Sequence, residues 1–157
     1  MSKKVAVLAV DPVNGFGLFR YLEAFYENGI EFEVFAVSDS REIATNSGLK
    51  IKTHDVIQNL KGRSGEFGAL VFACGDAVPK FGENSSKRYN ADMIQVISDV
   101  GRDGKILAGH WAAGMMLEMA GVAEGRKVAV HPLAKGAINK GVAVEDNYVA
   151  DGHIYTA

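Results

Sequence analysis

Short apolar runs suited to buried strands alternate along this chain with segments of helical periodicity, and this alternation restricts the possible folds more than any other feature. Residues 4–10 form a near-continuous apolar run with β-branched side chains, which is typical of a strand covered on both faces. Residues 17–28 carry apolar side chains at helical spacing and end at Asn28-Gly29, a helix stop. The repeated alternation predicts one α/β domain over residues 1–157, with a doubly wound, mostly parallel sheet in a three-layer sandwich.

The rest of the chain continues the same pattern. In a doubly wound sheet, ligands bind outside the carboxyl ends of the strands, so the loops there are the places to search for a site. Further strands are predicted at residues 31–37, 49–51, 69–74, 105–108 and 127–130. Helices are predicted at residues 55–60, 93–100 and 112–119, and a hairpin at 148–156 turning at Asp151-Gly152. The loops of interest are residues 11–16, 74–84, 109–114 and 131–135.

Composition excludes several classes of protein. A chain of 157 residues fits one domain and is long enough to bury a core without covalent staples. The 17 Lys and Arg residues against 19 Asp and Glu residues give a net charge of −2, which argues against nucleic acid or a membrane surface as partner. The single cysteine excludes an internal disulfide and suits a reducing cytoplasm. No apolar stretch approaches a membrane span, and we expect a cytoplasmic protein.

The common cofactor motifs are not met. Gly15-Phe16-Gly17 follows the first predicted strand, but the third small residue of a dinucleotide fingerprint is replaced by Arg20. The sequence contains no P-loop, HExxH motif or EF-hand loop. A Gly-rich turn without a bound cofactor is therefore the better interpretation, and we expect no cofactor.

Two histidines fall where a site is expected. His110 and His131 follow predicted strands at their carboxyl ends and could face one pocket. A metal would need a third ligand, for which Asp76 or Asp11 is available, but no ligand spacing supports it. We therefore expect no metal. The remaining histidines are expected at the surface: His54 and His153.

The sharpest local feature is the segment ILAGHWAAG at residues 106–114. A buried strand ends in small residues, one residue protrudes, and a helix begins among small residues, which is the shape of a nucleophile elbow. The following backbone N–H groups could hold an oxyanion. The apex, however, is Trp111, and an indole is no nucleophile. From spacing alone, a plain strand–helix turn whose Trp fills a groove fits equally well.

Four pieces in this order resemble the ThiJ/PfpI superfamily, which includes intracellular proteases and amidases and the Parkinsonism-associated deglycase, on a class I glutamine amidotransferase-like fold. The first strand and its Gly-containing turn match at residues 4–17, and a Pro-Gly-Gly-like turn matches at 70–75. The elbow, usually Ala-Ile-Cys-(Ala/His)-Gly, matches at 108–113. The most specific piece is His-Pro-Leu-Ala-Lys at 131–135. The resemblance implies a flavodoxin-like fold and a homodimer.

The resemblance also assigns roles to individual residues. The reactive cysteine of the elbow corresponds to Trp111, and the family's histidine to His131. The oxyanion donors would be the backbones of Gly75 and Ala112. An acidic residue near the start of the first helix falls at or near Gly17. The scaffold, the anion hole and the histidine are thus retained, whereas the nucleophile and its acidic partner are not.

Cys74 replaces the first Gly of the Pro-Gly-Gly turn and invites a second interpretation. Beside His131 or His110, its pKa would fall and the thiol would become reactive. Otherwise it is an inert, partly buried thiol at a strand end, which we favour. Asp76 and Asp11 flank the same mouth, where turn chemistry is their commoner role.

Three functions follow. The first is a ThiJ/PfpI-like protein without the family's cysteine chemistry, which binds an unidentified small molecule or acts in stress response. The second is an active amidase, protease or deglycase-like hydrolase using Cys74 with a nearby histidine. The third is a structural or interaction module. The family's C-terminal helix is expected to be missing after Ala157, which would leave an apolar face for a second copy to cover.

Overall fold

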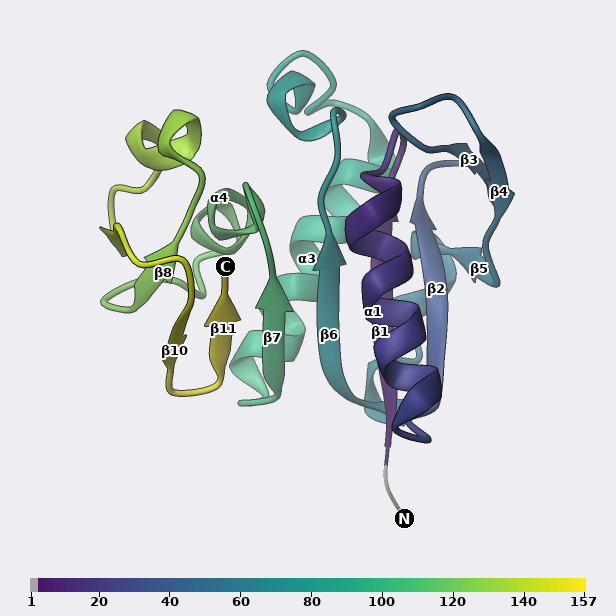
Figure 1. Cartoon of the computed structure of the whole chain (residues 1–157), viewed down its shortest axis with the longest axis horizontal. Helices are drawn as coiled ribbons and strands as arrows, with labels where there is room; N and C mark the ends of the chain where they lie inside the picture. The colour runs from purple at the N-terminus through teal and green to yellow at the C-terminus, as the bar shows by residue number, and fades with distance from the viewer. Residues whose placement is uncertain (1–2) are drawn as a thin grey trace.

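The computed structural model describes residues 3–157 and is built on a central sheet of seven strands (Figure 1). The strand order is β10-β11-β7-β6-β1-β2-β5, and every neighbouring pair is parallel except β10 and β11. The prediction of a mostly parallel α/β sheet is confirmed. The strands are β1 (Lys4–Val10), β2 (Phe32–Val37), β5 (Asp55–Val56), β6 (Phe67–Ala73), β7 (Ile106–Gly109), β10 (Val149–Asp151) and β11 (Ile154–Thr156).

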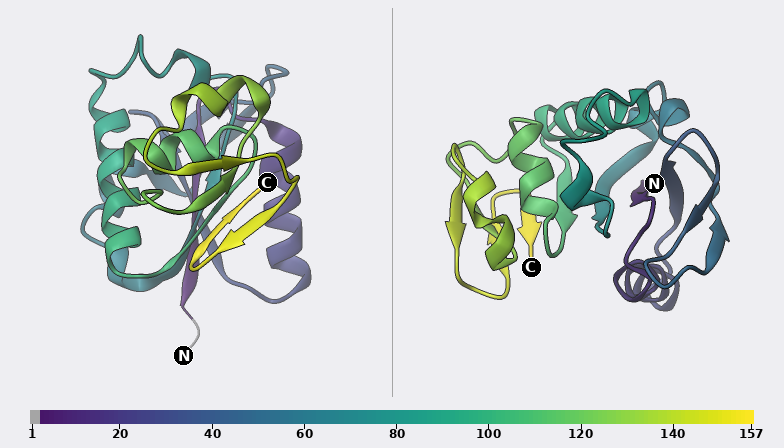
Figure 2. Two further views of the ribbon diagram at one scale, coloured as in Figure 1. Left: turned by 90° about the vertical axis from the view of Figure 1, so that its left-hand side faces the viewer. Right: turned by 90° about the horizontal axis from the view of Figure 1, so that it is seen from above.

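Helices cover both faces of the sheet and complete the three layers. Helix α1 lies on one face, and α3 and α4 lie on the other (Figure 2, right). Val7, Leu8 and Ala9 of β1 are therefore fully buried, as an apolar run without alternation predicts. No helix of residues 3–157 is long and apolar enough to cross a membrane. The helices are α1 (Gly15–Glu27), α2 (Ile57–Leu60), α3 (Arg88–Arg102) and α4 (Ala113–Met119), with 3₁₀ turns at Ser64–Glu66, Val78–Lys80 and Pro132–Ala137.

The direction in which the chain is wound reverses beside β1. From β1 the chain adds β2 and β5 on one side, and then adds β6, β7 and β11 on the other. The connections that follow β1 and β6 therefore cross to opposite faces of the sheet, and such a switch point leaves a crevice outside the carboxyl ends of the strands.

Two short strand pairs lie outside the central sheet. Strands β3 (Glu42–Ala44) and β4 (Lys50–Lys52) are antiparallel, and β8 (Lys127–Ala129) pairs in parallel with β9 (Val142–Val144). The strand predicted at residues 127–130 thus forms, but not as a member of the central sheet. Strands β3 and β9 were not expected, because three residues carry no clear periodicity.

Three predicted helix boundaries are wrong by a few residues, and one of them is the start of α3, at residue 88 rather than 93. Helix α1 begins at Gly15 rather than at residue 17, because Asn14 caps it: the Asn14 side-chain oxygen accepts the Gly17 N–H at 2.6 Å. The segment 55–60 was expected to be all helix. Its first two residues instead form β5, since they pair with β2 at the edge of the sheet.

Glu118 of α4 fastens the segment between β8 and β9 to the body of the domain. Its carboxylate accepts the backbone N–H groups of Asn139, Lys140 and Gly141, the last at 2.8 Å. Partial burial works against ionisation, but these three donors outweigh it and lower the pKa of the Glu118 carboxyl. The charged form is the one that the fold stabilises.

We expect Glu118→Gln to lower the free energy of unfolding by about 1–2 kcal/mol near pH 7, because an amide meets the three donors with one oxygen and a competing NH₂. Since the folded pKa is lowered, this stabilisation is present above the unfolded value of about 4.3 and is lost as pH falls through the folded value. Urea denaturation at a series of pH values measures both effects. Glu124→Gln, at an exposed site, is the matched control. An equal loss of unfolding free energy in both variants would contradict the prediction, and so would a loss in Glu118→Gln that stays the same at acid pH.

Candidate functional site

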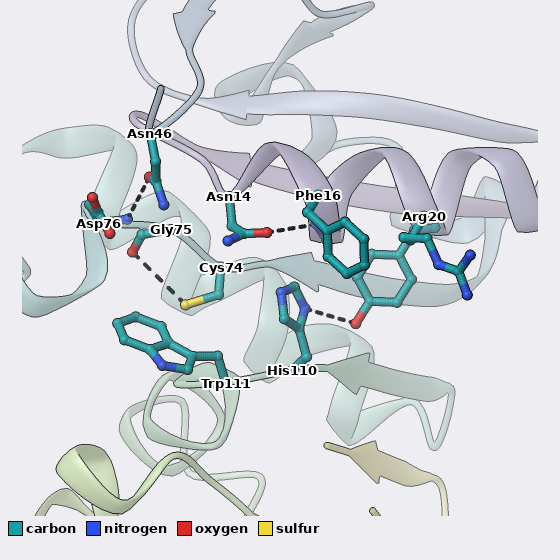
Figure 3. Close-up of a pocket in the computed structure, with 11 residues that line it drawn as sticks. Asn14, Phe16, Arg20, Asn46, Cys74, Gly75, Asp76, His110 and Trp111 are labelled. Carbon is teal, nitrogen blue, oxygen red and sulfur yellow. Dashed lines mark hydrogen bonds between the residues drawn. The ribbon is translucent and has the colours of Figure 1, made fainter. Parts of the chain in front are cut away.

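A cavity of about 550 Å³ opens at the carboxyl ends of the central strands, at the switch point beside β1 (Figure 3). Three loops and the first turns of α1 bring its walls together, as the strand order predicts. Its lining consists of Asn14, Phe16, Gly17, Arg20 and Tyr21 around the start of α1, Asn46 after β3, Cys74, Gly75 and Asp76 after β6, and His110 and Trp111 after β7.

Gly75 allows the loops after β1 and β6 to touch. A Cβ atom at this position would lie 2.2 Å from the Pro12 carbonyl oxygen and 2.5 Å from the Val13 Cα. The same approach lets the Asn14 N–H donate to the Cys74 carbonyl at 2.9 Å. A residue without a side chain is required here because the neighbouring atoms are backbone and cannot move aside.

The turn between β7 and α4 has the geometry of an elbow. Trp111 has φ of +58° and is the only residue other than glycine with positive φ in residues 3–157. Two glycines make the sharp turn possible: a Cβ at Gly109 would lie 2.4 Å from the Ala113 Cβ, and one at Gly114 would lie 2.3 Å from a Val130 methyl group. A non-glycine residue held in this region costs about 1–3 kcal/mol, and such strain is concentrated at functional sites.

His131 lies on the side of Trp111 that faces away from the first cavity. The centroids of the two side-chain rings are 5.5 Å apart, and the backbone N–H of His131 donates to the backbone carbonyl of Trp111 at 2.9 Å. The His131 Nδ1 accepts the Leu133 N–H at 3.2 Å. His131 lines a neighbouring cavity of about 470 Å³, which shares His110 and Trp111 with the first. His110 and His131 thus do line one cavity, as the sequence suggested, but it is the second one, and Gly75 lines only the first.

His110 points into the first cavity and is paired with Tyr21 of α1. The Tyr21 hydroxyl and the His110 Nδ1 are 3.0 Å apart. Burial lowers the pKa of His110, and burial, aided by the nearby Cys74 sulfur, raises the pKa of Tyr21 to about 12. Both groups are thus neutral near pH 7. A Cβ at Gly17 would lie 2.4 Å from the His110 Nε2, so His110 occupies the space that an acidic side chain at Gly17 would need.

Cys74 is fully buried at the end of β6. Burial raises the pKa of its thiol to about 11, against the opposing effect of backbone groups of Ala112 and Gly75. The sulfur contacts the Gly75 carbonyl at 3.9 Å, and no hydrogen bond joins it to an imidazole within residues 3–157. This environment favours the inert thiol over the activated one.

The two aspartates at the mouth behave differently. Asp11 accepts the Ala44 N–H at 2.9 Å and so ties the loop after β1 to strand β3, which is a contact between distant segments and not the local turn that was expected. Asp76 is exposed and lines the cavity, while its own N–H donates to the Asn46 side-chain oxygen at 3.0 Å. In the described part of the chain, no group of three His, Cys, Asp or Glu side chains is arranged to hold a metal ion.

Several lining residues were not expected from the sequence. Tyr21 belongs to the apolar stripe of α1, and a Tyr at that spacing is usually a core residue. Phe16 and Arg20 were considered only as parts of an incomplete dinucleotide fingerprint. Asn14 and Asn46 lie in loops, where Asn is common for turn reasons alone. Arg20 and Asn14 could have been found from their place in the sequence. Both are polar or charged residues near the start of the helix that follows the first strand, where a pocket was expected.

The geometry defines a class: a doubly wound α/β protein with an elbow and a pocket at the carboxyl ends of its strands. Within this class, the chain belongs to the DJ-1/PfpI family, whose model matches residues 3–157. The resemblance noted in the sequence is thereby confirmed at the level of the family.

Comparison with individual known proteins gives the same family and fold. The chain is 57% identical to Protein ppBat of Bacteroides thetaiotaomicron, over all of this chain and 90% of the relative. It matches a crystal structure from the same organism, described as "putative protease I", with 56% identity and a TM-score of 0.98, over 99% of this chain and 90% of that one. Drosophila melanogaster DJ-1beta, at 19% identity, shares the fold with a TM-score of 0.83, over all of this chain and 82% of its own.

Proposed function

We propose that this DJ-1/PfpI protein binds a small molecule in the cavity beside Trp111 and does not use the family's cysteine chemistry. The observation that carries the proposal is the residue at the elbow. Trp111 has the strained backbone of an elbow apex, and its side chain faces the cavity where a nucleophile would act. An indole has no nucleophilic or acid–base role in acyl transfer, whereas its flat apolar face suits ligand contact.

The surroundings of Trp111 support the same conclusion. Gly17 supplies no acidic partner, and His110 fills the space beside it. Cys74 is buried and protonated, with burial raising its pKa to about 11. Nearby groups that could move a proton, His110 and Tyr21, are neutral and bonded to each other. The cavity itself is of the size that small-molecule sites have.

The alternative is a hydrolase that uses Cys74. The name of the Bacteroides structure speaks of a protease, so peptide cleavage belongs among the activities to assay. This alternative requires the thiol to ionise and to meet a general base, and the described contacts of Cys74 supply neither.

The test compares the wild type with Cys74→Ser and Trp111→Cys in assays of glyoxal and methylglyoxal consumption, amide hydrolysis and peptide cleavage. We expect the wild type and Cys74→Ser to remain at the rate of buffer. Trp111→Cys places a thiol at the apex and should exceed both, because nucleophilic catalysis depends on that group.

Two outcomes would contradict the proposal. Robust wild-type turnover that is lost in Cys74→Ser would favour the Cys74 hydrolase. Robust turnover that Cys74→Ser leaves unchanged would exclude Cys74 as nucleophile and require another catalytic group. The homodimer that the resemblance implied, the cytoplasmic location predicted from composition and the proposed role in stress response stay predictions; size-exclusion chromatography at several concentrations tests the first.

A further inference from the structure

The cavity offers hydrogen-bond donors from two amide side chains. The Asn14 Oδ1 accepts the Gly17 N–H at 2.6 Å, and the Asn46 Oδ1 accepts the Asp76 N–H at 3.0 Å. Each carbonyl oxygen is thus used by the protein backbone. Since the other half of a primary amide is an NH₂ group, each residue still offers two N–H donors to a ligand, while its oxygen is already engaged in one hydrogen bond. Both residues line the cavity, and Figure 3 shows their nitrogen atoms on the side away from these two bonds.

Arg20 adds a positive charge to the same wall. It lies on α1, one turn beyond Phe16, and its side chain is exposed. Within residues 3–157 no carboxylate lies within 4.0 Å of its guanidinium, whereas most other arginines of this chain have such a partner. A guanidinium lining a cavity without an acidic neighbour is available to hold an anionic group, which it can bind through two parallel hydrogen bonds.

Aromatic side chains line another part of the cavity. Phe16 is 79% exposed although it is a large apolar residue, and it stands over the cavity together with Tyr21 and Trp111. An exposed aromatic ring at the rim of a pocket is costly in water and favours contact with a flat apolar group.

Asp76 restricts how an anion can lie. Its exposed carboxylate also lines the cavity and would repel a negative charge placed beside it. Figure 3 shows Asp76 and Arg20 toward opposite sides of the pocket. The favourable place for a negative group is therefore the Arg20 side, whereas the Asn14 amide nitrogen points away from Arg20 and is left to donate to a neutral oxygen of the ligand.

We propose that the cavity binds a small organic carboxylate with a flat, aromatic group. Arg20 holds the carboxylate, and the aromatic group packs among Phe16, Tyr21 and Trp111. This inference rests on the small-molecule binding proposed above and specifies the chemical class of the ligand. Binding requires no change in covalent bonds.

The probes are phenylacetate, its neutral isostere phenylacetamide, and 2-phenylethylamine. Trp111 is the only tryptophan of the chain and lines the cavity, so its fluorescence reports binding without a label. We expect phenylacetate to change the fluorescence saturably, with a Kd at least about 10-fold lower than that of phenylacetamide, since a charge-assisted pair is about twice as strong as a neutral bond. The amine should bind most weakly, because Arg20 repels it.

Variants separate the ligand class from folding. Arg20→Gln should raise the Kd for phenylacetate about 10-fold and leave that for phenylacetamide unchanged. Asp76→Asn should lower the Kd for phenylacetate by removing the repelling charge. Arg102→Gln, whose guanidinium pairs with Asp99 outside the cavity, is the matched control and should change neither value. These positions are exposed, so the variants should retain the thermal stability of the wild type.

Equal Kd values for the acid and the amide, no saturable response to any probe, or an Arg20→Gln variant with wild-type affinity for phenylacetate would overturn the proposed ligand class. Those results leave the question of cysteine chemistry untouched, because the turnover assays with Cys74→Ser and Trp111→Cys answer it separately. Conversely, robust Cys74-dependent turnover would overturn the proposed function whatever the probes show.

Discussion

Iodoacetamide is expected to alkylate Cys74 in the native protein at least about 100-fold more slowly than in the urea-unfolded chain at about pH 8. The thiolate is the reacting species, and burial raises the pKa of the Cys74 thiol to about 11, from the free value of about 8.5. Each unit of pKa above the ambient pH lowers the thiolate fraction tenfold. The sulfur is also fully buried, so the reagent must wait for an opening of the structure.

The measurement is mass spectrometry of the alkylated protein over time, at several pH values. The native rate should still rise with pH above about 10, where a free thiol with a pKa of about 8.5 is almost fully ionised and its rate has reached a plateau. Because the chain has one cysteine, every alkylated molecule reports this site. Trp111→Cys in a Cys74→Ser background is the matched control, since it moves the single thiol to a residue that lines both cavities. A native Cys74 rate with a midpoint near neutral pH would contradict the prediction and revive the Cys74 hydrolase.

The sequence was sufficient for the sheet and for the position of the pocket. Apolar runs such as residues 4–10 have one stable place, between two layers of helices, so β1 could be expected to be covered on both faces. Loops at the carboxyl ends of strands then had to meet, and Cys74, Gly75, Asp76, His110 and Trp111 do line one cavity. The small residues around position 111 correctly indicated a sharp turn, which the positive φ of Trp111 makes explicit.

The sequence could not predict which cavity each side chain faces. His131 follows β8, which pairs with β9 and not with the central sheet, so its loop lies on the far side of Trp111. Tyr21 shares its spacing with core residues of α1, and only the approach of His110 turns it into a pocket residue. The missing side chain at Gly17 leaves the space that the His110 ring occupies. These two residues lie far apart in the chain, and one sequence alone contains no sign that they are in contact.

Gly75→Ala is expected to lower the free energy of unfolding by at least about 3 kcal/mol, the upper end of the usual cost of overpacking. The added Cβ would meet the Pro12 oxygen at 2.2 Å, the Val13 Cα at 2.5 Å and the Asn14 nitrogen at 2.8 Å. All three are backbone atoms of one loop, so relief requires the loop after β1 to move away from β6. Such movement would also break the bond from the Asn14 N–H to the Cys74 carbonyl.

Gly82→Ala in the following loop is the matched control, because a Cβ there meets nothing within 4 Å. It should change stability by no more than about 0.5 kcal/mol, or raise it slightly by restricting the unfolded chain. Urea denaturation followed by Trp111 fluorescence measures both variants, and resistance to proteolysis compares them if Gly75→Ala is too unstable for a full curve. Similar stabilities in the two variants would contradict the prediction. A loss confined to Gly75→Ala would mean that the close approach of the loops after β1 and β6, which also shapes the cavity, leaves no room for a side chain at this position.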